Sequence, residues 1–372
     1  MHKTILPALF CALLMASCSD SPSVLSESKT PPSSSITDES ASELSTVEVD
    51  KASQARIDSF MTVHTASGLF AGVVGVYTGF DEDFVKAYGQ RNSEKDLPFE
   101  RQTRVNIASL DKLFTTVAIL RLVQEEKLDL EQKVKDILPE LSDPRSDEVT
   151  LLNLLNHTSG YGMYWDDPYF QENMEELTSI PAYMAFLKDA PIAFEPGSEQ
   201  QYSNTGFVLL GAVIEKVTDG TYYDYIESLI LDPLGMENTG YRIDFQDDRL
   251  ATGYMRDPQD PEAPLQPADP FTPIMGNSAG GGYSTLDDLY RFVKAFYAGE
   301  LLDREGMVLT TTHFERSVGE LKGLLLGGGA PGANSIIDYD IDADLLIIVL
   351  SNYDPPGAEE AARTIRGLIL KP

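Results

Sequence analysis

The sequence predicts an α+β fold for most of this 372-residue chain. Three observations lead to this prediction. Strand-like segments lie toward both ends of the chain, helix-like segments fill the middle, and no linker or repeat interrupts the stretch from residue 52 onward. We therefore expect a sheet built from both termini, with a helical subdomain inserted between its halves. At 42% hydrophobic residues, the chain can bury a large core.

The composition argues against nucleic acid as a partner. Lys and Arg together number 28, and Asp and Glu number 59, which gives a formal net charge of −31. Such a field repels a phosphate backbone.

The first 18 residues have the pattern of an export signal. A basic start precedes an apolar run over Ile5–Ala16, about a dozen residues, whereas a bilayer span needs roughly 20. The run ends in Met15-Ala16-Ser17-Cys18, which resembles the lipobox of bacterial lipoproteins, whose cysteine carries the lipid. We expect lipidated Cys18 in an exported, periplasmic or cell-surface lipoprotein of a bacterium, anchored to a membrane by its acyl chains. An ordinary cleaved signal is the alternative.

Residues 19–51 are predicted to be a disordered tether. They are rich in Ser, Thr, Pro and acidic residues and have almost no large apolar ones, so they cannot bury enough surface to fold. The folded domain is then expected over residues 52–372. Because Cys11 and Cys18 are the only cysteines, the domain has no disulfide, cysteine nucleophile or cysteine-ligated metal.

The first part of the domain divides into a helix, two strands and a series of helices. Helical spacing covers Ala52–Ala66, and a polar turn separates the strand-like stretches Phe70–Tyr77 and Asp83–Tyr88. A long apolar helix is expected over Ser109–Glu125. Further helices are expected over Leu151–Leu155, Ile180–Leu187, Thr205–Thr218 and Tyr222–Ile230.

The last part of the domain supplies the other half of the sheet. A helix over Leu286–Ala298 starts behind a Ser-Thr pair that can cap it, and acidic residues occupy its first turn. Ser335–Tyr339 and Leu345–Ser351 are predicted to pair as a hairpin. The chain closes with a helix over Ala358–Leu370.

Ser109-Leu110-Asp111-Lys112 is the first candidate for chemistry. Residues three apart share a helix face, so Ser109 and Lys112 should lie side by side at the start of the long apolar helix. A serine hydroxyl becomes a nucleophile when a neighbouring base takes its proton. Lysine can be that base if burial and the positive end of a helix lower its pKa from about 10.4 toward neutrality. The alternative is a capping serine beside a snorkelling lysine.

Two further segments are candidates. Tyr202 can shuttle a proton, and Asn204 can hold a substrate amide or carbonyl, just before a predicted helix. The glycine-rich stretch Gly327–Gly332 could let a substrate lie along a strand edge, with a backbone N–H free to stabilise an oxyanion. A flexible turn is the alternative for that stretch.

Two other patterns are weaker. Gly276-Asn277-Ser278-Ala279-Gly280 matches G-x-S-x-G, but a nucleophile elbow needs a strand before it and a helix straight after, which its Pro-rich and Gly-rich flanks do not offer. Four aspartates over residues 338–344 alternate like a calcium loop, but they lack the glycine and glutamate of an EF-hand. No zinc-site spacing of histidines exists, and we expect neither a metal nor another cofactor.

Taken together, the segments resemble one family. Their order along the chain is that of serine β-lactamase-related hydrolases, and the resemblance extends from about Ala52 to Leu370. The nearest kin are class C β-lactamases, D-alanyl-D-alanine carboxypeptidases, D-aminopeptidases and family VIII carboxylesterases. The resemblance implies a fold of the β-lactamase and penicillin-binding-protein type, with helices flanking an antiparallel sheet. The motifs are Ser109–Lys112, Leu154–Gly160, Phe194–Gly197, Tyr202–Asn204, Pro233–Met236, Ala279–Gly281 and the glycine-rich stretch.

The resemblance also implies a mechanism when its residues are carried over one by one. Ser109 would attack an acyl carbon, and Lys112 and Tyr202 would share the proton transfers. Asn204 would orient Lys112 and the substrate. The backbone N–H groups of Ser109 and Gly329 would form the oxyanion hole, and water would hydrolyse the acyl-enzyme without a metal.

The same resemblance suggests how the substrate pocket is lined. Tyr161, Tyr164 and Trp165 follow a family segment that shapes the active-site wall, so they line the acyl pocket or else pack as aromatic residues under a loop. Gly328 is a further candidate for contact with the substrate. We treat His157, which lies within the wall segment, as structural.

One departure from the family pattern bears on the substrate. Leu326 stands where the family usually has Lys or His, three residues before the oxyanion-hole residue. Lys322 is the nearest base upstream, but four residues of strand span roughly 13 Å, too far for a direct replacement. The missing cation and the acidic field both weaken binding of a substrate carboxylate. We therefore rank a carboxylesterase above a D-Ala-D-Ala carboxypeptidase, D-aminopeptidase or β-lactamase, with a non-catalytic binding protein on this fold as the other alternative.

Overall fold

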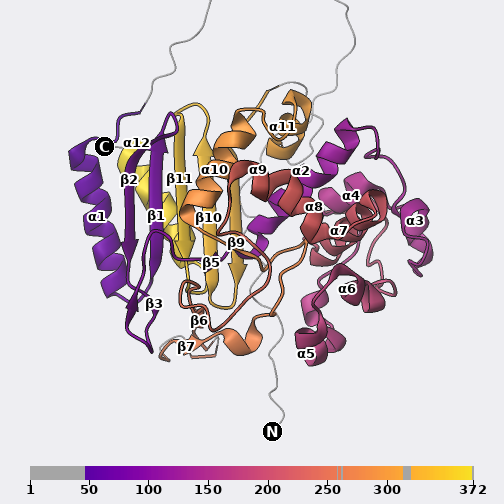
Figure 1. Ribbon diagram of the computed structural model, residues 1–372, viewed down its shortest axis with the longest axis horizontal. Coiled ribbons are helices and arrows are strands. Elements are labelled where there is room, and N and C mark those ends of the chain that lie inside the picture. Colours follow the sequence, from indigo (N-terminus) through magenta and orange to yellow (C-terminus); the bar gives the residue numbers. More distant parts are fainter. Residues whose placement is uncertain (1–46, 258, 261–262, 313–319, 371–372) are drawn as a thin grey trace, which may run out of the picture.

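A five-stranded antiparallel sheet lies at the centre of the computed structural model (Figure 1). The structure describes residues 47–370, apart from 258, 261–262 and 313–319. The predicted export signal, Cys18 and the tether up to residue 46 therefore lie outside the described residues. Helices surround the sheet, and the predicted α+β class is confirmed.

Both ends of the chain contribute strands to the sheet, as the sequence predicts. Strand β1 (Gly72–Thr78) pairs with β11 (Leu345–Ser351), so the two ends of the domain meet in the middle of the sheet. Gly327–Ala330 belong to a strand, and the flexible-turn alternative for them is wrong. Across the sheet the order is β2 (Asp81–Tyr88), β1, β11, β10 (Ala333–Asp340) and β9 (Leu324–Ala330), which makes β9 an edge strand.

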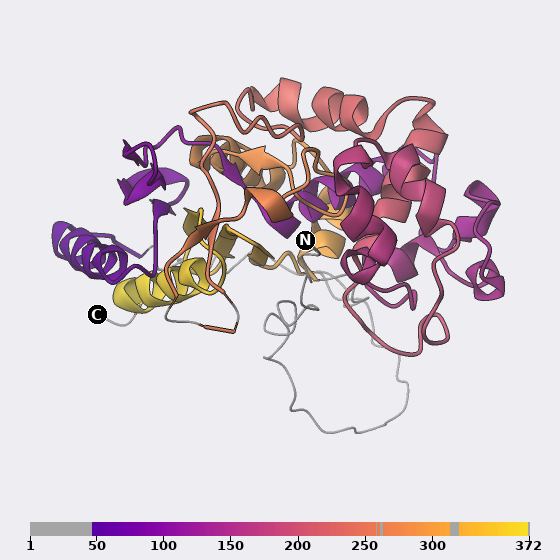
Figure 2. The same ribbon diagram turned by 90° about the horizontal axis from the view of Figure 1, so that it is seen from below.

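Each face of the sheet has its own core, because side chains alternate along a strand. Ile347 and Val349 of β11 face the first and last helices, α1 (Lys51–Ala66) and α12 (Gly357–Leu370). These two helices lie side by side over one face of the sheet (Figure 2). Ile348 and its alternate neighbours belong to the larger core on the opposite face.

The chain enters this fold just before the predicted start of the domain. Val49 is 5% exposed and packs into the core beside α1. The Asp50 side chain caps α1 by accepting the backbone N–H of Ser53 at 2.7 Å. The predicted first helix, Ala52–Ala66, is confirmed with one more residue at its start.

Helix α10 (Leu286–Tyr297) covers the opposite face of the sheet next to β1 and β11 (Figure 1). Its predicted cap is Thr285, whose hydroxyl accepts the backbone N–H of Asp288 at 3.3 Å. The preceding Ser284 instead ends strand β8 (Tyr283–Ser284).

The inserted helical subdomain also lies on this side, and its predicted helices form. The long apolar helix begins as a 3₁₀ turn over Ala108–Leu110 and continues as α2 (Asp111–Gln124). The predicted helix Tyr222–Ile230 divides into α8 (Tyr222–Ile226) and a π turn over Glu227–Leu231. The other predicted helices are α4 (Leu151–Leu155), α6 (Ile180–Leu187) and α7 (Asn204–Thr218).

The remaining elements are short, and the sequence pattern did not identify them. The unpredicted elements include β3 (Gln90–Asn92), β4 (Leu97–Pro98), β5 (Val105–Asn106), β6 (Tyr254–Met255), β7 (Gln266–Pro267), α3 (Val134–Ile137), α5 (Pro168–Asn173), α9 (Asp232–Leu234) and α11 (Arg304–Thr311).

Among the described residues, no helix combines the length and apolar character needed to cross a membrane.

Candidate active site

Ser109 lies in a tight turn between strand β5 and helix α2. The Asn106 side chain accepts the backbone N–H of Ala108 at 2.8 Å, which bends the chain after the strand. Ala108 then adopts a φ of 48°, in the left-handed region that residues with a Cβ rarely occupy. This strained turn places Ser109 in the 3₁₀ turn two residues before α2, at the helix end where backbone N–H groups lack partners within the helix.

Two side chains lie within hydrogen-bond distance of the Ser109 hydroxyl. Tyr202 Oη is 2.7 Å from Ser109 Oγ, and Lys112 Nζ is 3.3 Å from it. The helical spacing of Ser109 and Lys112 therefore brings them together as predicted. Tyr202 reaches the same oxygen from the segment just before α7.

Lys112 is held inside the protein and does not extend to solvent. The residue is 6% exposed, so the snorkelling alternative is wrong. Its amine donates to Asn204 Oδ1 at 2.7 Å and to the backbone carbonyl oxygen of Ala279. It also lies 4.8 Å from the centre of the Tyr202 ring and 5.3 Å from that of Phe207. Together with the Ser109 hydroxyl, Asn204 and Ala279 place oxygen atoms from three segments of the chain around the amine.

His157 packs against the segment that carries Tyr202. Its ring centre is 4.6 Å from that of Tyr202, and its Nδ1 accepts the backbone N–H of Ser203 at 3.2 Å. Its carbonyl accepts the backbone N–H of Gln201 at 2.8 Å. These contacts fit the structural role expected for His157. The Ser203 hydroxyl in turn caps α7 by accepting the Gly206 N–H at 2.8 Å, which fixes the start of the helix at Asn204.

Two glycines bring other parts of the fold against the Ser109 turn. A Cβ on Gly328 would lie 2.3 Å from the carbonyl oxygen of Ile107 and 3.1 Å from the backbone nitrogen of Ser109. A Cβ on Gly280 would lie 2.8 Å from the carbonyl oxygen of Ala108. Edge strand β9 can therefore approach the nucleophile turn only because it has no side chain at residue 328. Gly329 is the next residue of that strand and pairs with Asn334.

The third motif lacks its usual base, as the sequence indicates. Leu326 pairs with Ile337 across β9 and β10 and packs, partly buried, against the larger core. Lys322 precedes β9. The backbone of Lys322 bonds to residues outside the candidate site: its carbonyl accepts from the Tyr297 hydroxyl at 3.0 Å, and its N–H donates to the Thr311 hydroxyl at 3.3 Å.

The aromatic residues proposed for the pocket wall pack into the larger core. Tyr161 is 1% exposed and belongs to the core, so the expectation that it lines the acyl pocket is wrong and the packing alternative holds. Trp165 is partly buried, with its ring centre 4.9 Å from that of Phe170 and 6.1 Å from that of Tyr164. The Tyr164 hydroxyl accepts from the Asn277 side chain at 2.9 Å.

The G-x-S-x-G match is not a second nucleophile. Ser278 is fully buried, and a Cβ on Gly211 of α7 would lie only 2.2 Å from its hydroxyl oxygen. The aspartates at the end of β10 form a turn, in which Asp340 accepts the backbone N–H of Ala343 at 3.1 Å. Within the described residues, no group of three or more His, Cys, Asp and Glu side chains is placed to hold a metal ion.

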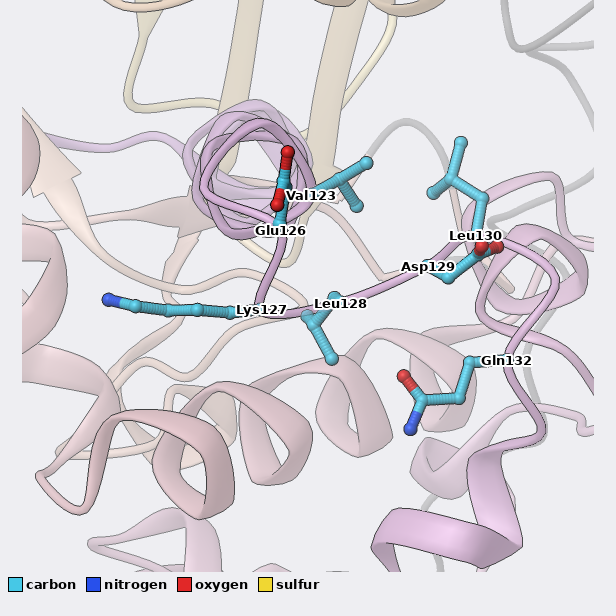
Figure 3. A pocket seen from close by; sticks show the side chains of 7 residues that line it. All are labelled: Val123, Glu126, Lys127, Leu128, Asp129, Leu130 and Gln132. Carbon is cyan, nitrogen blue, oxygen red and sulfur yellow. The ribbon is translucent and has the colours of Figure 1, made fainter.

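A surface hollow of about 530 Å³ lies at the other end of α2 (Figure 3). The 14 residues of α2 span about 20 Å, and Ser109 and Lys112 are at the opposite end of the helix. The hollow is therefore no part of the candidate site. It is lined by Val123, Glu126, Lys127, Leu128, Asp129, Leu130 and Gln132.

Asp111 is a buried acid beside the site that the sequence interpretation passed over. It is 1% exposed, and its carboxylate accepts the backbone N–H of Gly282 at 2.6 Å. Burial raises the pKa of Asp111 to about 7, against the opposing effects of the Gly282 hydrogen bond and of Lys112. An acidic residue at the start of an otherwise apolar helix was the available signal.

Comparison with known proteins agrees with this geometry. The Beta-lactamase family model matches residues 54–370. Esterase EstB of Burkholderia gladioli is 29% identical over 277 residues, which cover 66% of this chain and 70% of that protein. A crystal structure of a penicillin binding protein from Bacillus halodurans has 27% sequence identity and a TM-score of 0.73, over 83% of this chain and 99% of that one.

Coverage of some relatives is partial. An uncharacterized protein of Mycobacterium tuberculosis is 29% identical over 241 residues, which cover 59% of this chain and 60% of that protein. The match thus spans about three fifths of the relative's length. The family model nevertheless covers nearly all of the described residues, and the resemblance inferred from the ordered motifs is confirmed. The chain belongs to the Beta-lactamase family, a family of serine hydrolases.

Proposed function

We propose that the protein hydrolyses an ester or amide through an acyl-enzyme on Ser109, with carboxylic esters as its main substrates. One observation carries the proposal. The Ser109 hydroxyl lies 2.7 Å from the Tyr202 phenol and 3.3 Å from the Lys112 amine, and Asn204 holds that amine in place. A nucleophile next to a base, with the base itself oriented by a third group, is the arrangement that activates a serine.

The proton transfers follow from the hydrogen bonds at Ser109. We assign the proton transfers to the neutral Lys112 amine and the Tyr202 phenol together. Lys112 takes the hydroxyl proton as Ser109 Oγ bonds to the acyl carbon. When the ester C–O bond breaks, the Tyr202 phenol gives its proton to the leaving alcohol and regains one from Lys112. In deacylation, Lys112 takes a proton from water, the hydroxide adds to the acyl carbon, and Ser109 leaves with that proton.

The oxyanion would be stabilised by backbone N–H groups of Ser109 and Gly329. The N–H of Ser109 belongs to the start of α2, where the helix dipole favours negative charge. Gly329 is on edge strand β9, which approaches Ser109 closely through its neighbour Gly328. Gly328 would also offer backbone contact to the substrate, and Trp165 remains a candidate for the acyl pocket.

The ester preference rests on what surrounds the nucleophile. Leu326 replaces the usual cation of the third motif, and the chain carries a net charge of −31, so a substrate carboxylate has less to bind. The 29% identity to a protein named as an esterase supports the same choice. Hydrolysis of β-lactams or of peptides ending in D-alanine ranks lower.

Covalent labelling with a fluorophosphonate tests the proposal. We expect one adduct, on Ser109, located by intact mass and peptide mapping of residues 47–372. Ser109→Ala should abolish labelling and p-nitrophenyl ester hydrolysis, and Lys112→Ala should reduce both by roughly 100-fold or more. Ser278→Ala, which changes a buried serine outside the proposed mechanism, is the control. Full esterase activity in Ser109→Ala, or an adduct on Ser278, would reject the assignment.

The alternative of a binding protein on the same fold is favoured by Leu326 and by the short segment before the third motif. It makes a different prediction for the same samples. A well-folded wild-type protein that takes no adduct and hydrolyses neither esters nor lactams at any pH would support it. The intact set of Ser109, Lys112, Tyr202 and Asn204, all within contact, is why we rank the enzyme first.

We also propose that the protein is exported and anchored through lipid on Cys18. The apolar run and the lipobox-like residues before Cys18 support this proposal. Expression of the full chain with radiolabelled palmitate should give a labelled, membrane-associated product. Cys18→Ser should lose the label, whereas Cys11→Ser should keep it. A label-free but secreted wild type would support the ordinary cleaved signal instead.

A further inference from the structure

The loop formed by residues 276–282, here named the glycine loop, wraps around the Ser109 turn. Its Gly281 N–H donates to the carbonyl of Ala108 at 3.2 Å, and its Gly282 carbonyl accepts from Ile107 at 2.9 Å. Its Ala279 carbonyl accepts from Lys112. The position of this loop therefore sets one of the three oxygen partners of the Lys112 amine.

Helix α2 holds the glycine loop with two side chains one turn apart. Asp111 accepts the Gly282 N–H at 2.6 Å, and Thr115 donates its hydroxyl to the carbonyl of Ser278 at 2.7 Å. Ala279, which contacts Lys112, lies between these two anchors in the chain. A third anchor comes from outside α2, where the Tyr223 hydroxyl donates to the Gly276 carbonyl at 3.0 Å.

We propose that Asp111 is a positioning residue for the nucleophile. By accepting the Gly282 N–H, it fixes the glycine loop against helix α2, and so keeps the Ala279 carbonyl in contact with Lys112. This role rests on the proposed function, because Lys112 matters here as a partner of Ser109. The Asp111 carboxyl group acts through the glycine loop, whereas the contact of Asp111 with Ser109 is a backbone one, from its N–H to the Ser109 carbonyl.

The burial of Asp111 supports a role for its hydrogen bond. A buried carboxyl group lowers stability unless it is hydrogen-bonded, and a charged acceptor binds an N–H more strongly than a neutral one. The charged and titratable groups that act on it or respond to it are Lys112 from its own helix and Tyr222, Tyr223 and Tyr241 from the packed helical side. Tyr222 also bonds to Thr115 at 2.8 Å, which ties this group of side chains together.

The test compares two substitutions of similar size at Asp111. Asp111→Asn keeps an oxygen that can accept the Gly282 N–H, whereas Asp111→Leu removes it. Asp288→Leu is the matched control, because Asp288 is also fully buried and accepts a backbone N–H, that of Asn238, at 2.8 Å. The same segment of the chain, residues 47–372, is used for each variant. Asp111→Ala replaces Asp111→Leu if the leucine variant does not fold.

Two readouts separate this inference from the proposed function. Amide hydrogen exchange of residues 276–282 reports the loop directly, whether or not the protein is an enzyme. Asp111→Leu should raise exchange there roughly tenfold or more, while Asp111→Asn and Asp288→Leu should leave it near that of the wild type. The fluorophosphonate labelling rate of Ser109 should fall roughly 10- to 100-fold in Asp111→Leu and recover to within about fivefold in Asp111→Asn.

Each outcome decides between the two claims. Unchanged exchange in Asp111→Leu overturns the positioning role. Faster exchange with a wild-type labelling rate shows that Asp111 holds the loop without affecting the nucleophile, and this also overturns the proposal. A wild type that is never labelled and hydrolyses neither esters nor lactams rejects the proposed function, and the catalytic part of this inference falls with it. The exchange data then still show whether Asp111 holds the loop.

Discussion

At the scale of single residues, the candidate site depends on where Lys112 is held. Its amine is buried and contacts oxygens from its own helical turn, at Ser109, and from two distant parts of the chain, at Asn204 and Ala279. A buried amine that loses one partner keeps the cost of its desolvation. Small changes around Lys112 should therefore affect reactivity more than changes at exposed polar residues.

Asn204→Ala tests that dependence. Removing the amide takes away the 2.7 Å partner of Lys112, so kcat/KM for an ester should fall roughly 10- to 100-fold. We expect the loss mainly in kcat, measured by steady-state hydrolysis of a p-nitrophenyl ester. Asn173→Ala, which removes an exposed amide bonded to the Tyr169 carbonyl, is the control. Equal rates for both variants would show that Asn204 does not orient Lys112.

Asp111 should make stability depend on pH. Its folded pKa is about 7 against an ordinary 3.8, so between these values the folded state binds the extra proton and stability falls as pH rises. From about pH 5 to about pH 8.5, the wild type should lose about 3 kcal/mol of unfolding free energy relative to Asp111→Asn. Urea unfolding of both proteins at each pH measures the difference. A constant difference across that range would contradict the raised pKa.

At the scale of elements, the close approach of strand β9 to the Ser109 turn is the feature most sensitive to mutation. A Cβ on Gly328 would meet the Ile107 carbonyl at 2.3 Å, so Gly328→Ala must push the strand away from Ser109. We expect a loss of about 1–3 kcal/mol in stability and severe loss of labelling. Gly367→Ala, in α12 with nothing within 4 Å, should instead be neutral or slightly stabilising. Denaturant unfolding and fluorophosphonate labelling give both numbers, and wild-type labelling in Gly328→Ala would remove β9 from the site.

Elements whose own residues carry a clear pattern were predicted well, and elements that depend on contacts with distant residues were not. The hairpin of β10 and β11 and the apolar helix α2 have strong local patterns, and both were predicted nearly to their ends. Gly327–Ala330 have little β propensity of their own. They form a strand because they pair with β10. Two-residue strands such as β5 have no pattern of their own and arise from contacts with distant residues.

The candidate site divides in the same way. Helical periodicity alone places Lys112 beside Ser109, whereas Tyr202 and Asn204 are more than 90 residues away, and only the resemblance joined them to Ser109. The Ala279 carbonyl is a backbone group, so no side-chain pattern could identify it as a partner of Lys112. Tyr161 was misplaced because an aromatic residue after a loop looks the same in sequence whether it faces a pocket or the core.

At the scale of the whole molecule, the acidic charge should select among substrates. A net charge of −31 repels an anionic ester, and Leu326 supplies no compensating cation in the third motif. Two esters that differ only in a terminal carboxylate or its methyl ester should therefore differ in kcat/KM, with the neutral one preferred at low salt. Raising ionic strength from about 0.02 M to about 0.5 M should increase kcat/KM several-fold for the anionic ester and little for the neutral one, because salt screens the field.

The Leu326→Lys variant tests whether the position of a cation, and not only the net charge of the molecule, determines the preference between the two esters. A lysine there restores the family's usual cation at the strand edge, so it should raise kcat/KM for the anionic ester and reduce its dependence on salt, while the neutral ester changes little. Leu325→Lys, at a neighbouring residue that is 67% exposed, adds the same charge and is the control. If the wild type already prefers the anionic ester and salt weakens that preference, another cation serves the site and the ranking of neutral esters first is wrong. If both lysine variants respond alike, net charge rather than the position of the cation governs selectivity.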